Sequence, residues 1–219
     1  MIRRHFRTSL TALLFAVAAV MFGHGAWIYV KARIAQTLLH VAWRRTLAGA
    51  HGVRPWPWAD TTTVARIHFD RDGSDSIVLA GTTGRTLAFA PGHMDASAGP
   101  GDDGNCVISA HRDTQFAALR TLVRGDIIRL ERPDRRVAVY RVEATRVIDR
   151  SELAVATPTP DSRLTLITCW PFEALVAGGR RRYVVTALRV SDTHAQATFR
   201  TFPSSSFHHP IVGPSLRRH

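Results

Sequence analysis

The stretch Leu164 to Phe172, with the sequence LTLITCWPF, decides the fold and the function expected of this chain. Its first five residues are apolar or β-branched and carry no charge, which is typical of a buried strand. Cys169 closes this run, and Pro171 cannot donate a hydrogen bond to a continuing ladder, so the strand is predicted to end there. The thiol is therefore expected at the mouth of a strand, where a rigid sheet can aim it at a ligand.

Two other stretches repeat this arrangement with different side chains. In Asn105 to Asp113 (NCVISAHRD), an apolar strand gives way to a polar turn at His111. The arginines at positions 180–182 lead into Tyr183 to Val190 (YVVTALRV), which is typical of a third strand. A cysteine, a histidine and an arginine at three strand ends are the components of a thiol acyl-transfer site.

The chemistry of such a site requires each of these side chains. A free cysteine is mostly thiol at neutral pH, so Cys169 needs a lowered pKa or a base to become a nucleophile. His111 can act as an imidazolium partner of the thiolate or as a base, and it can then protonate a departing amine. An arginine can stabilise the developing oxyanion. The alternative interpretation is that Cys169 is a small buried apolar residue. His93, at the end of another predicted strand, is the rival to His111.

Three segments together resemble a known family: GNCVISAHRDTQFAAL, LTLITCWPF and RYVVTA, at residues 104–119, 164–172 and 182–187. They are similar to the sortases, which are membrane-anchored cysteine transpeptidases. The His-Arg-Asp-Thr form and the Trp-Pro-Phe after the cysteine most resemble the sortase class of Gram-negative bacteria. The resemblance covers roughly residues 61–190 and rests on three separated motifs in the right order.

The resemblance implies a mechanism and a set of partners. Cys169 would attack the Thr-Gly carbonyl of a Leu-Pro-x-Thr-Gly-like sorting signal on a surface protein, and His111 would protonate the departing glycine amine. An amine acceptor would then resolve the thioester, with water as a slower competitor. The sortase arginine stands five residues before a small residue, which selects Arg182 before Ala187. Arg181 is the alternative, because adjacent strand residues point to opposite faces.

Thr168 and Trp170 flank the cysteine and are the candidate substrate-binding residues; strand formation is the alternative role of Thr168. Two other functions stay open beside transpeptidation. One is a hydrolase of the same fold that only cuts, and the other is a sortase-like barrel kept as a non-catalytic binding module.

Many short strands between residues 59 and 190 favour a closed or nearly closed β-barrel. Residues 127–131 and 137–148, for example, are predicted to form a hairpin about the Pro133-Asp134 turn. The resemblance sets the number of strands. The predicted fold is therefore all-β, an eight-stranded sortase-type barrel at residues 59–190 with one or two short helices and a transmembrane helix before it.

The segments outside the barrel have distinct compositions. After a basic tail at residues 1–8, residues 9–30 carry no formally charged side chain and are long enough to cross a bilayer. A retained anchor is favoured over a cleaved signal peptide, since Trp27 and Tyr29 suit a membrane interface. Basic residues lie on both sides, so the extracytoplasmic placement of the barrel, periplasmic in a Gram-negative cell, follows from the resemblance. Residues 31–58 are expected to form a helical stalk and a Pro/Trp linker, and residues 191–219 a flexible tail.

Composition narrows the classes of partner and cofactor. The formal net charge of +12 on 219 residues is compatible with nucleic acid or an anionic membrane. Much of the excess flanks the apolar segment or ends the chain, and no basic-aromatic interleaving occurs, so nucleic acid is not expected. The two cysteines lack paired ligands for zinc, and neither a metal nor a cofactor is expected. Cys106 lies five residues before His111, about 16 Å at strand rise, too far for a bridge to Cys169.

Overall fold

The computed structural model describes residues 2–174 and 178–190 of the chain. The contacts divide the chain into Met1–Arg189 and Val190–His219. The tail expected at residues 191–219 lies outside the described residues, and the architecture below is that of the first unit.

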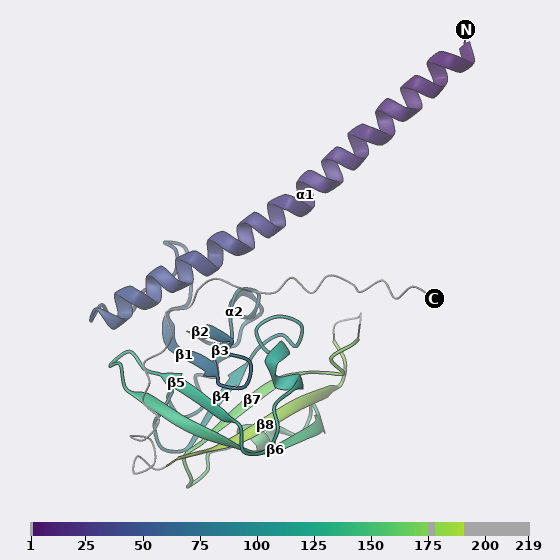
Figure 1. Cartoon of the computed structure of the whole chain (residues 1–219). Coiled ribbons are helices and arrows are strands. Elements are labelled where there is room, and N and C mark those ends of the chain that lie inside the picture. Colours follow the sequence, from purple (N-terminus) through teal and green to yellow (C-terminus); the bar gives the residue numbers. More distant parts are fainter. Residues whose placement is uncertain (1, 175–177, 191–219) are drawn as a thin grey trace. The chain divides into compact units, whose positions relative to one another are not determined.

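Within the described residues, eight strands close into a barrel, which confirms the all-β sortase-type barrel that was predicted (Figure 1). The strands are β1 (Thr63–Phe69), β2 (Asp75–Ala80), β3 (Gly92–His93), β4 (Asn105–Ser109), β5 (Ile127–Glu131), β6 (Val137–Asp149), β7 (Arg163–Trp170) and β8 (Arg181–Arg189). Their order around the barrel is β1-β2-β3-β4-β7-β8-β6-β5. The β2–β3 and β4–β7 pairs are parallel, whereas the other pairs are antiparallel.

Short helical segments lie in the connections of the described chain: α2 (Gly84–Leu87), η1 (Ala117–Arg120) and η2 (Leu153–Ala156). They number three where one or two were expected. Each has only four residues, which is too short for the periodic apolar pattern that identifies a helix in a sequence.

The barrel interior is filled by alternate residues of each strand. Leu164 and Leu166 of β7 belong to the buried core, together with Cys106 and Ile108 of β4 and Val185 of β8. Because successive strand side chains point to opposite faces, the intervening positions of these strands face outward. The parity of β7 therefore places Cys169 on the outer face of the barrel.

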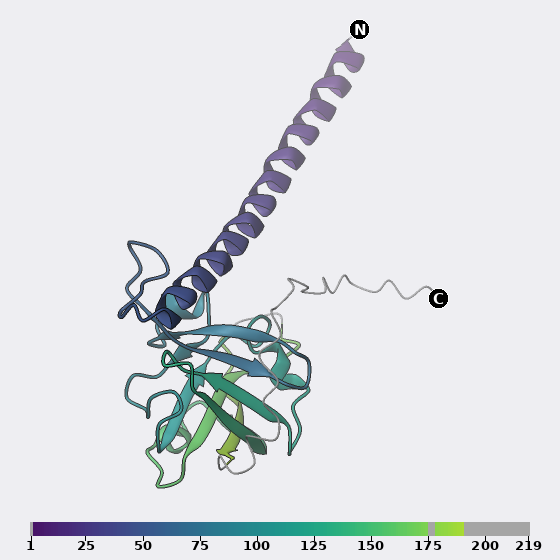
Figure 2. The ribbon, with the colours of Figure 1, turned by 60° about the vertical axis from the view of Figure 1, so that its left-hand side comes forward.

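The chain begins with one long helix, α1 (Ile2–Leu47), whose last turns pack against the barrel (Figure 2). Leu39 and Trp43 form a buried cluster with Ile77, Leu79 and Ala90. The indole Nε1 of Trp43 also donates a hydrogen bond of 3.1 Å to a carboxylate oxygen of Glu131 in β5. The end of the predicted stalk is thus packed into the folded domain.

The first part of α1 has a different character. In the described part of the chain, this is the one helix long and apolar enough to cross a bilayer, by length and composition. Several large apolar side chains in this part of the helix are exposed, among them Phe15, Met21 and Phe22. A membrane anchor accounts for both properties, and a cleaved signal sequence would share the composition.

Replacing Trp43 tests whether the end of α1 stabilises the barrel. We expect Trp43→Ala to lower the free energy of unfolding by about 3–5 kcal/mol, because it removes a buried indole and the hydrogen bond that this indole donates to the Glu131 carboxylate. The exposed Arg45→Ala is the matched control on the same helix and should change it by less than about 0.5 kcal/mol. Denaturant unfolding of the full chain in detergent measures both. Equal midpoints for the two variants would show that the helix end contributes nothing to the fold.

Candidate active site

The predicted nucleophile and the predicted arginine lie on neighbouring strands. In the antiparallel β7–β8 pair, Cys169 stands directly opposite Arg182. Directly opposed residues of an antiparallel pair share a face, with Cα atoms about 4.5–5.5 Å apart. The thiol and the guanidinium group therefore both start from the outer face of the barrel.

His111 lies on the other side of Cys169. In the parallel β4–β7 pair, Ser109 is level with Ile167, and extending this register by two residues brings His111 level with Cys169. The main chain continues to follow β7 beyond the end of β4, because the Ala110 amide donates to the Ile167 carbonyl at 3.2 Å. His111 itself is exposed. Three predicted site residues thus lie in a row across three adjacent strand ends.

The register also separates the two candidate arginines. Arg181 stands opposite Trp170, so it belongs to the other face of β8, and its side chain is exposed. Arg182 donates through Nη1 to the Gly179 carbonyl (2.6 Å) and to the Arg181 carbonyl (2.9 Å). Both of these bonds use Nη1, so among the described residues Nε and Nη2 have no hydrogen-bond partner. Of the two arginines, Arg182 is therefore the one beside the thiol.

Thr168 fastens the end of β7 to the segment that carries His111. Its side chain is only 2% exposed, and its hydroxyl donates to the Ala110 carbonyl at 2.7 Å. The hydroxyl is therefore committed to the backbone immediately before His111. This contact gives Thr168 a positioning role, and the predicted contact with substrate stays a prediction.

Trp170 belongs to an aromatic cluster at the end of the barrel core. Its ring stacks on Tyr183, with centroids 5.6 Å apart and planes inclined by 20°, and meets Phe172 edge-on at 5.6 Å. Phe172 and Tyr183 pack in turn against the core. Trp170 therefore lies on the face opposite Cys169, where it supports the loop that follows the thiol. Its substrate-binding role also stays a prediction.

Arg112 is a part of the site region that the sequence did not reveal. It is buried although it lies in a polar turn, and its Nη2 donates to the Ala174 carbonyl in the loop after β7. An ion pair between Arg120 and Glu173 joins the same two regions. Arg112 thus ties the turn that carries His111 to the loop that follows Cys169. Nothing in the sequence around Arg112 indicated that its side chain would be buried.

His93, the rival to His111, is occupied elsewhere. It is buried, and its Nε2 lies 2.8 Å from the Ala98 carbonyl and 3.2 Å from the Ser97 hydroxyl. Its strand register places it beside Ile108. The geometry therefore favours His111 as the neighbour of the thiol.

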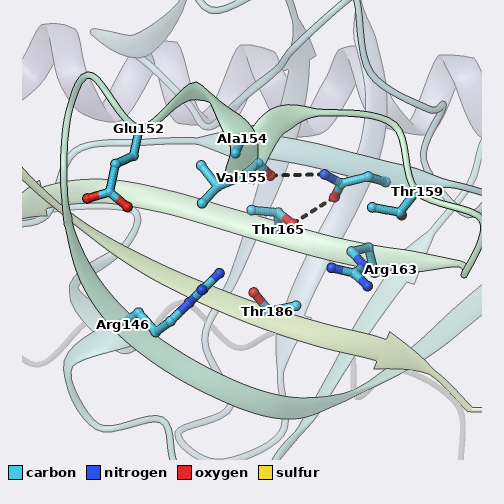
Figure 3. A pocket seen from close by; sticks show the side chains of 9 residues that line it. Arg146, Glu152, Ala154, Val155, Thr159, Arg163, Thr165 and Thr186 are labelled. Atoms are coloured by element: carbon cyan, nitrogen blue, oxygen red, sulfur yellow. Dashed lines mark hydrogen bonds between the residues drawn. The ribbon is translucent and has the colours of Figure 1, made fainter.

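A cavity of about 150 Å³ opens on the outer face of β7 and β8 (Figure 3). Cys169 is not among its lining residues. Thr165 lies in its floor, four residues before Cys169 and so about 13 Å along the strand. Its other lining residues are Asn105, Arg146, Glu152, Ala154, Val155, Thr159, Arg163 and Thr186. The cavity and the thiol therefore share one face of the barrel.

Asn105 holds the wall of this cavity in place. Its amide nitrogen donates to the Val155 and Thr157 carbonyls, both at 3.0 Å, and its amide oxygen accepts from the Thr165 hydroxyl at 2.7 Å. The connection between β6 and β7 is thereby pinned to β4, so the wall is a fixed part of the barrel.

The two cysteines differ sharply in environment. Both are free, as expected, but Cys106 is fully buried in the core whereas Cys169 is partly exposed. Burial, with a smaller contribution from the negative charge of Asp102, raises the pKa of the Cys106 thiol to about 12. Cys106 is therefore an inert core residue, and Cys169 is the thiol that a ligand can reach.

Comparison with known proteins identifies the family. The Sortase domain family matches residues 67–190, more than half of the chain, and the chain belongs to this family. Sortase D of Bacillus subtilis (strain 168) is 30% identical over 115 residues, which cover 52% of this chain and 57% of that protein. The match therefore spans little more than half the length of that relative.

Solved structures agree with this assignment. A Clostridium perfringens Sortase D5 transpeptidase is 25% identical, with a TM-score of 0.53 over 59% of this chain and 79% of that one. Listeria monocytogenes sortase A is also 25% identical, with a TM-score of 0.53 over 58% and 87% of the two chains. These relatives do not test the resemblance to the Gram-negative class, which stays a prediction.

The environments of the two thiols predict selective alkylation. We expect a thiol-directed reagent such as iodoacetamide to modify the native protein once, at Cys169, because only the thiolate reacts and the Cys106 thiol is both buried and protonated. Cys106→Ser should keep this single modification and Cys169→Ser should lose it, as measured by intact mass. Denaturation without reductant should make two thiols reactive in the wild-type chain. Modification of Cys106 in the native protein would contradict the placement of β4 in the core.

Proposed function

We propose that this protein is a cysteine transpeptidase that cleaves a Leu-Pro-x-Thr-Gly-like sorting signal and transfers the new carboxyl end to an amine. The observation that carries the proposal is the row of His111, Cys169 and Arg182 across the neighbouring strands β4, β7 and β8. Membership of the sortase family agrees with it. The substrate motif and the amine acceptor come from the family resemblance.

In the first half of the reaction, the Cys169 thiolate attacks the carbonyl carbon of the threonine in the signal. The carbon–nitrogen bond to the following glycine breaks, and a thioester to Cys169 remains. His111 donates a proton to the departing glycine amine as a general acid. The side-by-side register of these two residues supports this division of roles, because the leaving nitrogen is bonded to the carbon under attack.

Arg182 acts on the oxygen of the same carbonyl. As the thiolate adds, negative charge develops on that oxygen, and a fixed cation next to it lowers the barrier. Arg182 starts from the strand position opposite Cys169, and the bonds of its Nη1 to the Gly179 and Arg181 carbonyls orient the guanidinium group.

In the second half, an amine attacks the thioester carbonyl and a new peptide bond forms. His111 accepts the proton that the amine loses, and Cys169 is released as a thiolate. Water in place of the amine gives hydrolysis, which is the alternative function. A fold retained only for binding is the second alternative.

The cavity on the outer face lies at a distance from Cys169 that suits a signal of the proposed length. An extended peptide advances about 3.3 Å per residue, so the four residues before the scissile bond span about 13 Å. This matches the separation between Cys169 and Thr165 along β7. The Leu-Pro end of the signal would therefore reach the cavity, against the wall that Asn105 pins in place.

We further propose that α1 anchors the protein in a membrane, with the barrel on the extracytoplasmic side, where the signals of surface proteins are presented. The exposed apolar side chains before Val30 support the anchor. The proposed domain boundaries are those expected from the sequence, except that the end of α1 is assigned to the folded domain on the strength of its packing. A periplasmic location applies to a Gram-negative cell.

Mass spectrometry of a peptide carrying the signal tests the reaction. We expect cleavage between threonine and glycine, a thioester adduct on Cys169, and a ligated product when a small amine such as triglycine is added. Cys169→Ala should abolish cleavage and adduct alike, and His111→Ala should be nearly as damaging. Equal product distributions with and without the amine would favour the hydrolase, and an unreactive Cys169 would favour the binding module. Near wild-type cleavage by Cys169→Ala would overturn the proposal.

The two adjacent arginines provide a matched pair of variants. We expect Arg182→Lys to lower the transpeptidation rate by about 10²-fold or more, because lysine lacks the planar fork that can bind two oxygens and the loss resembles that of an oxyanion donor. Arg181→Lys should be almost silent, since its side chain belongs to the other face of β8. The rates of both variants on one peptide decide the assignment. The reverse ranking would move the role to Arg181.

A further inference from the structure

Exposed aromatic side chains gather beside α1, far along the sequence from Cys169. Trp58 is 82% exposed and Phe89 is 38% exposed. Trp56 meets the Phe89 ring edge-on, with centroids 4.8 Å apart, and Arg85 of α2 forms an ion pair with Asp60 at 3.6 Å. These contacts join the loop at residues 54–60 to the segment at residues 85–89. We name Trp56, Trp58, Arg85 and Phe89 the aromatic patch.

One hydrogen bond sets the height of this patch along α1. The side-chain amide of Gln36 donates to the Phe89 carbonyl at 2.8 Å. Gln36 lies six residues after Val30, where the apolar segment ends, and so about 9 Å further along the helix axis. The headgroup layer of a bilayer extends about 5–8 Å beyond each side of the hydrocarbon core. For a helix that crosses the membrane steeply, the Phe89 carbonyl is therefore held just outside the headgroup layer, within reach of an aromatic side chain that extends toward the bilayer.

The side chains of α1 at the end of the apolar segment and just beyond it have the same chemistry. The Lys31 ammonium group lies over the Trp27 ring at 5.0 Å, and the Arg33 guanidinium group lies over the Tyr29 ring at 5.1 Å. Arg33 also donates to the Tyr29 hydroxyl. Tryptophan and tyrosine concentrate at membrane interfaces, and basic side chains there are attracted to anionic lipid. The patch continues this interfacial composition onto the folded domain.

We propose that the aromatic patch is a second membrane contact, in which Trp58 and Phe89 enter the headgroup layer beside α1 and Arg85 faces lipid phosphates. A lipid surface lies close to this height when α1 spans a membrane, and the exposed aromatic and basic side chains of the patch match the composition of membrane interfaces. The proposal rests on the membrane anchor of the proposed function. Because the end of α1 is packed on the barrel, its consequence is that two points of contact fix the rotation of the whole protein about the axis of α1.

Lipids brominated near the glycerol end of the acyl chain test this contact, because bromine quenches only tryptophan that reaches the bilayer. The full chain is placed in nanodiscs of phosphatidylcholine and phosphatidylglycerol, with or without bromine. The fluorescence of the wild type minus that of Trp58→Phe isolates Trp58. We expect bromine to lower this difference signal, and by less than it lowers that of Trp27, because Trp58 lies in the headgroup layer above the brominated carbons. A Trp58 signal that bromine leaves unchanged and aqueous acrylamide quenches fully would overturn the proposal.

Difference signals from two further tryptophans distinguish a failure of the membrane anchor from a failure of the aromatic patch. The wild-type fluorescence minus that of Trp27→Phe reports Trp27 in the anchor, and bromine should quench this difference signal. The corresponding difference for Trp43→Phe reports Trp43, which is buried against the barrel seven residues beyond Gln36, and bromine should leave it unchanged. Quenched Trp27 with unquenched Trp58 would refute the patch and leave the anchor standing. Unquenched Trp27 would refute the anchor as well.

A charge reversal and an activity assay complete the test. Arg85→Glu should reduce the quenching of Trp58 more than Arg85→Gln does, without changing that of Trp27, because both variants break the ion pair with Asp60 but only the first places a carboxylate against lipid phosphates. Trp58→Phe should cleave a soluble signal peptide at the wild-type rate, since it lies outside the row of His111, Cys169 and Arg182. Loss of cleavage of the soluble peptide by this variant would show that Trp58 supports the catalytic site and would overturn its assignment as a membrane contact.

Discussion

The parallel pairing of β4 with β7 is the constraint on which the rest of the site depends. Parallel neighbours cannot be joined by a tight turn, so the chain between them makes β5 and β6 before it returns to the sheet. That detour allows His111 and Cys169, 58 positions apart, to stand level at the same end of two adjacent strands. Strand β8 then returns antiparallel on the far side of β7 and brings Arg182 opposite the thiol.

The contacts that hold this row together differ from those that fill the barrel. The core is apolar and non-directional, so many sequences could fill it equally well. The strand ends are instead fastened by directional bonds, from Thr168 to the Ala110 carbonyl and from Arg112 to the Ala174 carbonyl. These directional contacts hold the turn after β4 against the end of β7 and against Ala174 beyond it, close to His111 and Cys169.

The β-barrel, the long apolar helix and the strand-end position of Cys169 could be predicted from local patterns in the sequence, whereas the number of strands and the choice of Arg182 came from the family resemblance. Alternating apolar and polar residues indicate β1, and an uncharged apolar run indicates β7. Pro171, which ends the strand, places Cys169 at the end of β7. The burial of Arg112, the inward position of Thr168 and the Gln36 contact to the Phe89 carbonyl had no such signature. Each of these contacts depends on a partner that is distant in the sequence. A local pattern does not tell which two residues of distant segments stand side by side.

The burial of Cys106 determines how the protein responds to oxidants. The strand partner of Cys106 is Leu164, five residues from Cys169 and so about 16 Å along β7, well beyond the ~7 Å Cα separation that a disulfide tolerates. A sulfenic acid formed on Cys169 would therefore have no resolving thiol within the described residues. Its repair depends on a reductant from solution, so the redox state of the surrounding compartment, and no internal switch, governs how long the thiol stays competent.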